Sequence, residues 1–359
     1  MRNNSKQKVE KVVYFIVNHF GPDLETGFCD YLLLNTREAE NKYPGIRNAK
    51  IKFVSVNQKL DDYTENEILH RYIHVDCGGV DYDHHQDGAD TLCCSADKIL
   101  LDLGIKDPAI FKISRVIRSN DLNGTAVSDA IGLDLFTIIR GANLRYPDDP
   151  EIVVEKMMDL FEDLYEHFID VVQAEKDLDK LRVTEVKEGD RVFRIGSIYS
   201  DAANIVPVIR KEGGASLDIV IVQNSEDYAR ILKSSQSKAS MKMITTSVCF
   251  EEIFASELGC RLTMKEILEE LKTKNRIQGI PHWYLFKFRQ LINGGPKNPD
   301  APPTSLNLGQ LLRCVINALK EQIRIEKLIA ERKASKEMLE TSTKEELVEP
   351  VEPVVDNVD

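Results

Sequence analysis

The sequence predicts an α/β protein with a parallel-sheet domain, a connecting helix and a smaller α/β domain toward the C-terminal end. Short apolar runs alternate with amphipathic stretches over the first 145 residues, a pattern typical of strands and helices that alternate around a parallel sheet. A long stretch of helical periodicity then separates this part from a second alternating region. With 359 residues, the chain also exceeds the size of one ordinary core.

The predicted elements follow in order along the chain. The parallel-sheet domain spans residues 8–148, and its apolar or amphipathic runs are Val12–Val17, Tyr31–Tyr43, Ile51–Val56, Tyr72–Val75 and Leu92–Leu103. Residues 149–185 form the predicted connecting helix, because apolar side chains recur at nearly helical spacing. The C-terminal domain, residues 186–305, has predicted strands at Val192–Ile198, Leu217–Val222 and Tyr228–Leu232 and helices around 201–211 and 263–273. A terminal helix over 306–340 and a disordered acidic tail over 341–359 complete the prediction.

Composition and charge limit the class of partner. The longest apolar run near the start, Val12–Val17, is far shorter than the ~20 residues of a membrane span, so we expect neither a signal peptide nor a membrane anchor. Seven cysteines without a C-x-x-C pair favour a reducing, cytoplasmic setting. The net charge of −12 argues against long duplex DNA as a partner. Residues 186–300 carry a balance of +3 and can suit an anionic ligand, and the sequence leaves the oligomeric state open.

A histidine and two acids follow the first predicted strand. His19, Asp23 and Glu25 lie on one short turn, and a turn at a strand end can aim all three side chains at one point. The alternative is a Pro-Asp turn in which Asp23 or Thr26 caps the next helix.

A second group of polar residues follows the strand at Tyr72–Val75. Asp76 comes directly after it, and Gly78 and Gly79 allow the backbone to turn sharply there. The run Asp83-His84-His85 follows. Packing alone explains it poorly, because adjacent side chains on an extended segment point opposite ways and each imidazole then needs its own partner.

A further acid, Asp121, follows a helix-like stretch, where a helical C-terminal turn ending at Gly124 is the alternative interpretation. Taken together, two histidines and four acids are predicted at loop positions after sheet elements. This mixture of imidazole and hard oxygen ligands suits two octahedral Mn²⁺ or Mg²⁺ ions. Two such ions can activate a water molecule and clamp a phosphoryl group.

At these residues the sequence resembles the DHH phosphoesterase superfamily, which includes RecJ-type exonucleases, nanoRNases, cyclic-dinucleotide phosphodiesterases and manganese-type inorganic pyrophosphatases. The stretch from Val75 to Gln86, with Ser95-Ala96 after it, is also similar to the melanocyte-proliferating-gene family of exonuclease-like proteins. The resemblance covers residues 10–145, and the matching residues of the four motifs are His19, Pro22, Asp23 and Glu25, then Asp76, then Asp83, His84 and His85, and finally Asp121.

The resemblance implies a role for each of these residues. It implies one metal ion on His19, Asp23 and Asp76. It implies a second on Glu25, Asp76, His84 and Asp121, so that Asp76 bridges the two ions. Mn²⁺ is the expected ion, with Mg²⁺ or Co²⁺ as alternatives. His85 would face the substrate phosphate, and His85 and Asp83 are the predicted catalytic residues. The chain departs from the family in three ways: Glu25 replaces the usual Asp, only seven residues separate the second and third motifs, and no Gly-Gly-His follows in the C-terminal domain.

A group of aromatic, cationic and glycine residues in the C-terminal domain is the predicted substrate site. Aromatic side chains can stack on bases beside cations, although core packing explains the same aromatics. Gly213-Gly214 is a weaker candidate for a phosphate-approaching loop, and a plain helix-to-strand turn is its alternative. The predicted substrate-binding residues are Trp283, Tyr284, Arg289, Gly294, Gly295 and Lys297.

The sequence therefore predicts a cytoplasmic hydrolase that cleaves phosphodiester bonds in short oligonucleotides or nucleotide signals by two-metal activation of water. A pyrophosphatase or polyphosphatase is the alternative with the same chemistry. A non-catalytic nucleotide-binding protein with a degenerate metal site is the alternative from a different class.

Overall fold

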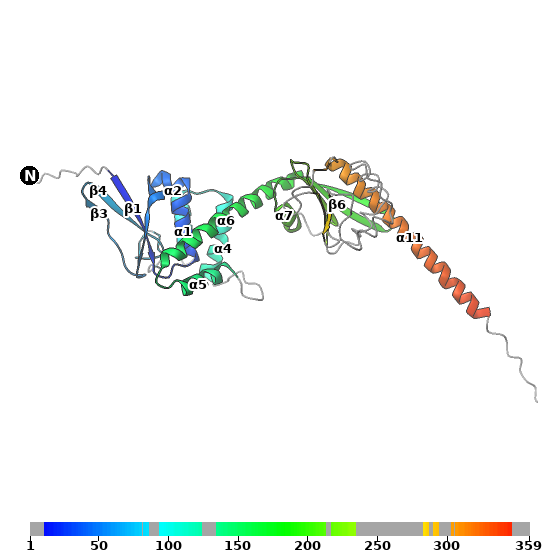
Figure 1. Cartoon of the computed structure of the whole chain (residues 1–359), viewed down its shortest axis with the longest axis horizontal. Helices are drawn as coiled ribbons and strands as arrows, with labels where there is room; N and C mark the ends of the chain where they lie inside the picture. Colours follow the sequence, from blue (N-terminus) through cyan, green and yellow to red (C-terminus); the bar gives the residue numbers. More distant parts are fainter. Residues whose placement is uncertain are drawn as a thin grey trace, which may run out of the picture. The chain divides into compact units, whose positions relative to one another are not determined.

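The computed structural model describes residues 11–80, 82–85, 93–123, 134–212, 217–234, 283–286, 290–293, 303–304 and 306–346. The chain divides into two compact units, Met1–Gln173 and Ala174–Asp359. Each contains one sheet with helices packed against it (Figure 1). The coarse prediction of an α/β protein is thereby confirmed.

The sheet of the first unit has four strands in the order β2-β1-β4-β3: β2 Lys50–Val54, β1 Lys11–His19, β4 Ile68–His74 and β3 Tyr63–Glu65. β1 pairs in parallel with both β2 and β4, while β3 is antiparallel to β4. In this register Val17 lies beside His74, so β1 and β4 end at the same edge of the sheet. The residues that follow these two strands therefore meet at that edge, which is where ligand sites form in parallel sheets.

Helices pack against the sheet face that carries Tyr14, Ile16 and Ile73, and their apolar residues form one core with these side chains. The first unit has the helices α1 Leu24–Asn35, α2 Arg37–Lys42, α3 Ser95–Leu103, α4 Pro108–Asn123 and α5 Leu135–Arg145, a short 3₁₀ turn at Ile46–Asn48, and most of α6 Pro150–Asp177. The near-continuous apolar sequence of β1 fits a strand covered on both faces.

α1 and α6 pack closely, and two residues of α1 explain how. Phe28 and Phe161 are both fully buried, with their ring centroids 5.3 Å apart. One residue earlier, Gly27 leaves room for Met157, whose Cβ would lie only 2.9 Å from a Cβ placed on Gly27. This close approach fixes the helix that Asp23 caps and whose first turn carries Glu25.

The second unit has a six-stranded sheet in the order β5-β6-β7-β8-β10-β9, in which only β6 and β7 are parallel. The strands are β5 Arg182–Glu188, β6 Arg191–Tyr199, β7 Ile219–Gln223, β8 Ala229–Lys233, β9 Trp283–Phe286 and β10 Gln290–Asn293. The first part of α11 Leu308–Glu346 packs through Leu311, Val315 and Leu319 against residues of this sheet. Every residue of β7 is buried. A further helix, α7 Ile205–Glu212, lies between β6 and β7 in the chain.

Several predicted elements need correction. The connecting helix ends at Asp177; a 3₁₀ turn at Leu178–Lys180 follows, and the predicted helical residues from Arg182 onward belong to β5. The terminal helix continues through Glu346, so residues 341–346 are not a disordered tail. β3 was not predicted, and the sheet of the first unit is mixed rather than wholly parallel. The helix predicted at 263–273 and residues 347–359 lie outside the described residues. Among the described residues, no helix is long and apolar enough to cross a membrane.

Candidate metal centre

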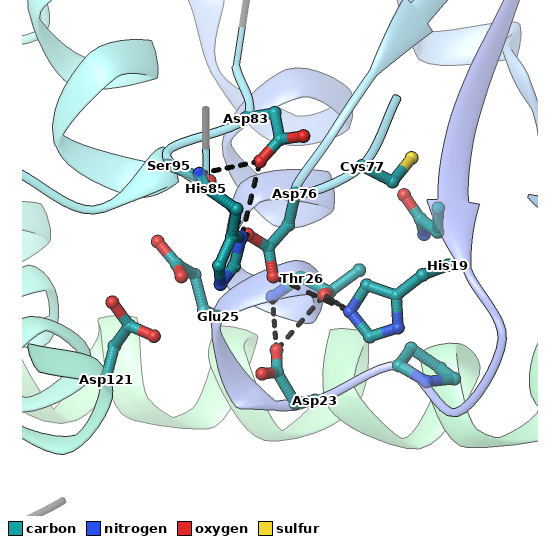
Figure 2. Close-up of polar contacts among 12 residues, drawn as sticks. His19, Asp23, Glu25, Thr26, Asp76, Cys77, Asp83, His85, Ser95 and Asp121 are labelled. Carbon is teal, nitrogen blue, oxygen red and sulfur yellow. Dashed lines mark hydrogen bonds and ion pairs between the residues drawn. The ribbon is translucent and has the colours of Figure 1, made fainter. Parts of the chain in front are cut away.

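The six predicted metal ligands come together at the edge of the first unit's sheet. Figure 2 labels five of them, His19, Asp23, Glu25, Asp76 and Asp121. They come from the end of β1, the start of α1, the loop between β4 and α3, and the last turn of α4. Their side chains form two groups in which candidate ligand atoms all lie within 4.8 Å of one another: His19, Asp23 and Asp76, and Glu25, His84 and Asp121. A further group of this kind joins Asp76 to His84 and His85.

The backbone turns sharply at Asp76 as it leaves β4. Asp76 has φ of 54°, a left-handed conformation that few residues other than glycine adopt and that Asp tolerates better than most. Gly78, at φ of 78°, also needs its missing side chain, because a Cβ there would lie 2.9 Å from the ring of His74. An unusual conformation at a buried carboxylate is often found at functional sites.

In the first ligand group, Asp23 and His19 are held by the start of α1 and by the backbone. Asp23 is the N-cap of α1, and its Oδ1 accepts hydrogen bonds from Thr26 N and Thr26 Oγ1. His19 Nδ1 lies 2.9 Å from the carbonyl oxygen of Phe20, so Nδ1 carries a hydrogen. The other ring nitrogen, Nε2, faces Thr26 Oγ1 at 3.1 Å and Asp76 Oδ2 at 3.5 Å.

In the second group, His84 lies between three carboxylates. Its Nδ1 is 3.2 Å from Asp76 Oδ1 and 3.7 Å from Glu25 Oε2, and its Nε2 is 3.4 Å from Asp121 Oδ2. Glu25 Oε1 accepts a hydrogen bond from Ala96 N at 3.0 Å. Within the described part of the chain, Glu25 Oε2 and Asp121 Oδ2 are buried and accept no hydrogen bond.

The two histidines hold protons tightly in the absence of a metal ion. Burial alone would lower the pKa of His19, but the contact with Asp76, the Phe20 carbonyl and the charge of Asp23 outweigh it and raise this pKa to about 9. For His84, the contact with Asp76 is the largest effect, and with Glu25 and Asp121 it raises the pKa to about 9 against the effect of burial. The carboxylates around His19 and His84 therefore favour the positively charged form of each ring.

The pKa values of the carboxylates around these histidines are also shifted. Burial, followed by the charges of Asp76 and Asp121, raises the pKa of Glu25 to about 8. Burial is also the main cause of the raised pKa of Asp121. Asp76 differs: burial would raise its pKa, but His19 and His84 hold it well below the usual range. Burial raises the pKa of Glu25 and of Asp121, and their buried oxygens accept no hydrogen bond among the described residues, so these carboxylates together with the two imidazoles form a donor set that fits a divalent metal ion.

His85 and Asp83 lie beside these groups. The His85 side chain is 57% exposed, and its Nδ1 is 3.3 Å from both Asp76 Oδ1 and Asp83 Oδ1. Asp83 is buried; its Oδ1 accepts a hydrogen bond from His85 N, and its Oδ2 accepts one from Gly79 N. Asp83 therefore holds the loop and the ring of His85, whose Nε2 is left as the outer ring nitrogen.

The structure places two of the six candidate ligands differently from the prediction. Glu25 and Asp121 lie in helices, in the first turn of α1 and the last turn of α4, rather than in loops. Asp23 caps α1 as the alternative interpretation proposed, yet it also faces His19 and Asp76, so the two interpretations are compatible.

The predicted substrate residues cannot be placed at a site. Only the backbone of Trp283 and Tyr284 is described, in β9. Gly213, Gly214 and the remaining four candidates, Arg289, Gly294, Gly295 and Lys297, lie outside the described residues.

Thr26 and Ser95 are both named in the sequence analysis, but neither is assigned a role there in supporting the ligands. The Ser95 hydroxyl contacts both Asp76 and His84, and Thr26 Oγ1 lies between His19 and Asp23. Both lie in the first turn of a helix, although the N-caps of α1 and α3 are Asp23 and Cys94.

Comparisons with known proteins add little to this geometry. Residues 47–168, about a third of the chain, match the family described as ChrB, C-terminal domain. The match includes Asp76, His84 and Asp121 but begins after the first ligand motif. No curated protein matches the chain in sequence. One solved structure, an uncharacterized protein from Helicobacter pylori G27, is 10% identical over 86% of this chain and 98% of its own, with a TM-score of 0.20 that is too low to support a shared fold.

Proposed function

We propose that the protein is a metal-dependent phosphoesterase that hydrolyses phosphodiester bonds in short oligonucleotides or nucleotide signals. One observation carries the proposal: two histidines and four carboxylates converge at one sheet edge, and each histidine turns Nε2 toward a carboxylate oxygen. The order of these residues along the chain agrees with the resemblance to the DHH phosphoesterase superfamily.

The residues would divide the work as follows. His19, Asp23 and Asp76 would hold one divalent ion, and Glu25, His84 and Asp121 a second, with Asp76 between the two groups. When bound, such a pair of ions supplies an activated water and neutralises charge on the phosphoryl oxygens. Mn²⁺ is the expected ion, with Mg²⁺ or Co²⁺ as alternatives, because imidazole and carboxylate ligands are mixed.

His85 is the residue best placed to meet the substrate. Its Nδ1 faces Asp83 and Asp76, so the ring orientation is set from within the protein. The exposed Nε2 of His85 would then face a non-bridging oxygen of the substrate phosphate. Asp83 is buried behind the ring and would act by orienting it rather than by touching the substrate.

The direct test is a hydrolysis screen of the purified full-length protein with and without Mn²⁺. Dinucleotides, cyclic dinucleotides and pyrophosphate are the substrates, and Asp76→Asn is the control for a contaminating hydrolase. We expect Mn²⁺-dependent cleavage of a dinucleotide or cyclic dinucleotide that the variant lacks. Faster turnover of pyrophosphate would favour the pyrophosphatase alternative, and nucleotide binding without any turnover would favour the non-catalytic one.

A further inference from the structure

The hydroxyl of Ser95, the first residue of α3, is buried between a carboxylate and an imidazole of the metal centre. Ser95 Oγ is 3.1 Å from Asp76 Oδ1 and 3.0 Å from His84 Nδ1, and the latter two atoms are 3.2 Å apart. These atoms therefore form a triangle in which every edge is a hydrogen-bond distance.

Hydrogen-bond directions within this triangle define the state of His84. The ionised Asp76 carboxylate only accepts hydrogen bonds, so Ser95 Oγ donates to it and its oxygen lone pair is left to accept. His84 Nδ1 faces that lone pair and an oxygen of Asp76, and both contacts require a hydrogen on Nδ1. In a neutral ring the lone pair must then lie on Nε2, the atom that faces Asp121.

The next residue of α3 acts on a third ligand. Ala96 N donates to Glu25 Oε1, which leaves Oε2 directed toward His84. The extra methylene of Glu25, compared with the Asp of the DHH superfamily, fits this arrangement because one carboxylate oxygen must reach α3 while the other stays at the metal group.

We propose that the first turn of α3 is a positioning element for the metal centre, in which Ser95 fixes the tautomer and orientation of His84 and Ala96 N–H fixes Glu25. Ser95 and Ala96 do not bind the ion themselves. The inference rests on the proposed function for the identity of the ligands, but its central statement concerns a ring tautomer that exists with or without metal. Partners that orient a ligating histidine are typically worth ~10- to 100-fold in metal affinity.

The test compares wild type with Ser95→Ala, Ser95→Thr and, as a matched control, Ser114→Ala, which removes another buried serine hydroxyl of the same unit. Ring nitrogens of ¹⁵N-histidine-labelled, metal-free full-length protein are recorded by NMR over a series of alkaline pH values, until the nitrogen shifts show a neutral ring. Signals of His84 are identified by their loss in His84→Gln. Mn²⁺ affinity of the same proteins is measured by calorimetry at neutral pH.

We expect His84 to be Nδ1-protonated in wild type, Ser95→Thr and Ser114→Ala, and to become a mixture of tautomers in Ser95→Ala. Mn²⁺ affinity should fall about 10-fold or more in Ser95→Ala alone and recover in Ser95→Thr. An Nε2-protonated ring in wild type, or an unchanged tautomer in Ser95→Ala, would overturn the inference. Wild type that shows the expected tautomer but binds no Mn²⁺ would instead refute the proposed function and leave the positioning of His84 intact.

Discussion

Asp76 is the carboxylate that links the two ligand groups, because one of its oxygens faces His19 and the other faces His84. Replacing it with Asn keeps a side chain that tolerates the left-handed backbone found here, so the fold should survive. We expect Asp76→Asn to lower kcat/KM by more than about 100-fold. That is more than the loss usually seen when a residue that only orients a metal ligand is removed. Circular dichroism provides the control for folding, and near-normal turnover would contradict the two-metal arrangement.

Glu25 gives a second prediction at the level of the single residue. Its two carboxylate oxygens are used separately, one by Ala96 N–H and one toward His84, so a shorter side chain cannot reach both. Glu25→Asp should therefore weaken the binding of one Mn²⁺ ion and leave the other largely unchanged, as measured by calorimetric stoichiometry. Tighter binding and faster turnover in this variant would mark Glu25 as a degenerate ligand.

The pKa shifts of three ligands predict how metal stabilisation depends on pH. His19 and His84 have a pKa raised from 6.5 to about 9, so their ion pairs stabilise the metal-free fold fully below pH 6.5 and are lost as pH rises through 9. The pKa of Glu25 is raised from 4.5 to about 8, so between these two pH values the unfolded chain loses this proton more readily than the folded one, and the metal-free fold loses stability. All three effects therefore lower its stability as pH rises.

Bound metal needs these same groups deprotonated, so its stabilisation should increase with pH. We expect the difference in Tm between Mn²⁺-loaded and EDTA-treated protein to grow steadily from pH 6 to pH 8. Asp76→Asn serves as the comparison, and its difference should be small throughout. A wild-type difference that is constant or shrinks over this range would show that these groups do not bind the ion.

At the level of elements, the packing of α1 on α6 yields a stability prediction. Ala at position 27 would place a Cβ 2.9 Å from the Cβ of Met157, and overpacking of this kind costs about 1–3 kcal/mol. Gly141→Ala in α5 is the matched control: nothing lies within 4 Å of its Cβ position, and a helical Gly-to-Ala change there should stabilise by about 0.5–1 kcal/mol. The stability of both variants is measured by the midpoint of urea unfolding, taken from the transition of the first unit, which is the one that Mn²⁺ shifts. Equal midpoints for the two variants would refute the packing argument.

Which elements the sequence could predict depended on how strongly each one is patterned. β1 and α6 are long and regular, and both were predicted, because period and burial agree in them. β3 has only three residues, all exposed, so no apolar pattern marks it. β5 begins only a few residues after α6, and no Gly or Pro marks the end of the helix, so the predicted connecting helix runs into the first residues of β5. The end of α11 contains few apolar residues, so its sequence resembles the acidic tail that follows, and the predicted helix stops at residue 340 rather than 346.

The candidate site was predictable to a similar degree. Residue types and their order along the chain made His19, Asp76 and His84 candidates, because charged side chains are rarely buried without a partner, and the structure brings these three side chains together. The partners of these groups were not predictable. Ser95 lies 19 residues from Asp76 and 11 from His84 in sequence, and only the paths of β4 and α3 bring the three together.

At the scale of the whole molecule, the six candidate ligands all belong to the first unit, whereas the residues predicted to bind the substrate belong to the second. Pyrophosphate binding requires dense positive charge around two phosphates, yet residues 186–300 have a balance of only +3. The same segment places Trp283, Tyr284 and Phe286 shortly before Arg289 and Lys297. Aromatic side chains beside cations favour a ligand that carries a base.

The difference between a ligand with a base and one without predicts the effect of removing the aromatic rings. Stacking of a base on an aromatic side chain is worth ~1–3 kcal/mol, so Trp283→Ala or Tyr284→Ala should raise KM for a dinucleotide several-fold or more. Hydrolysis of a base-free aryl phosphate should change little, because the candidate metal centre in the first unit is untouched. Circular dichroism of each variant must first match wild type, since the same rings can serve as core. Equal losses on both substrates in a folded variant would exclude base stacking, and a higher kcat/KM for pyrophosphate than for every nucleotide would replace the nucleotide assignment with the pyrophosphatase alternative.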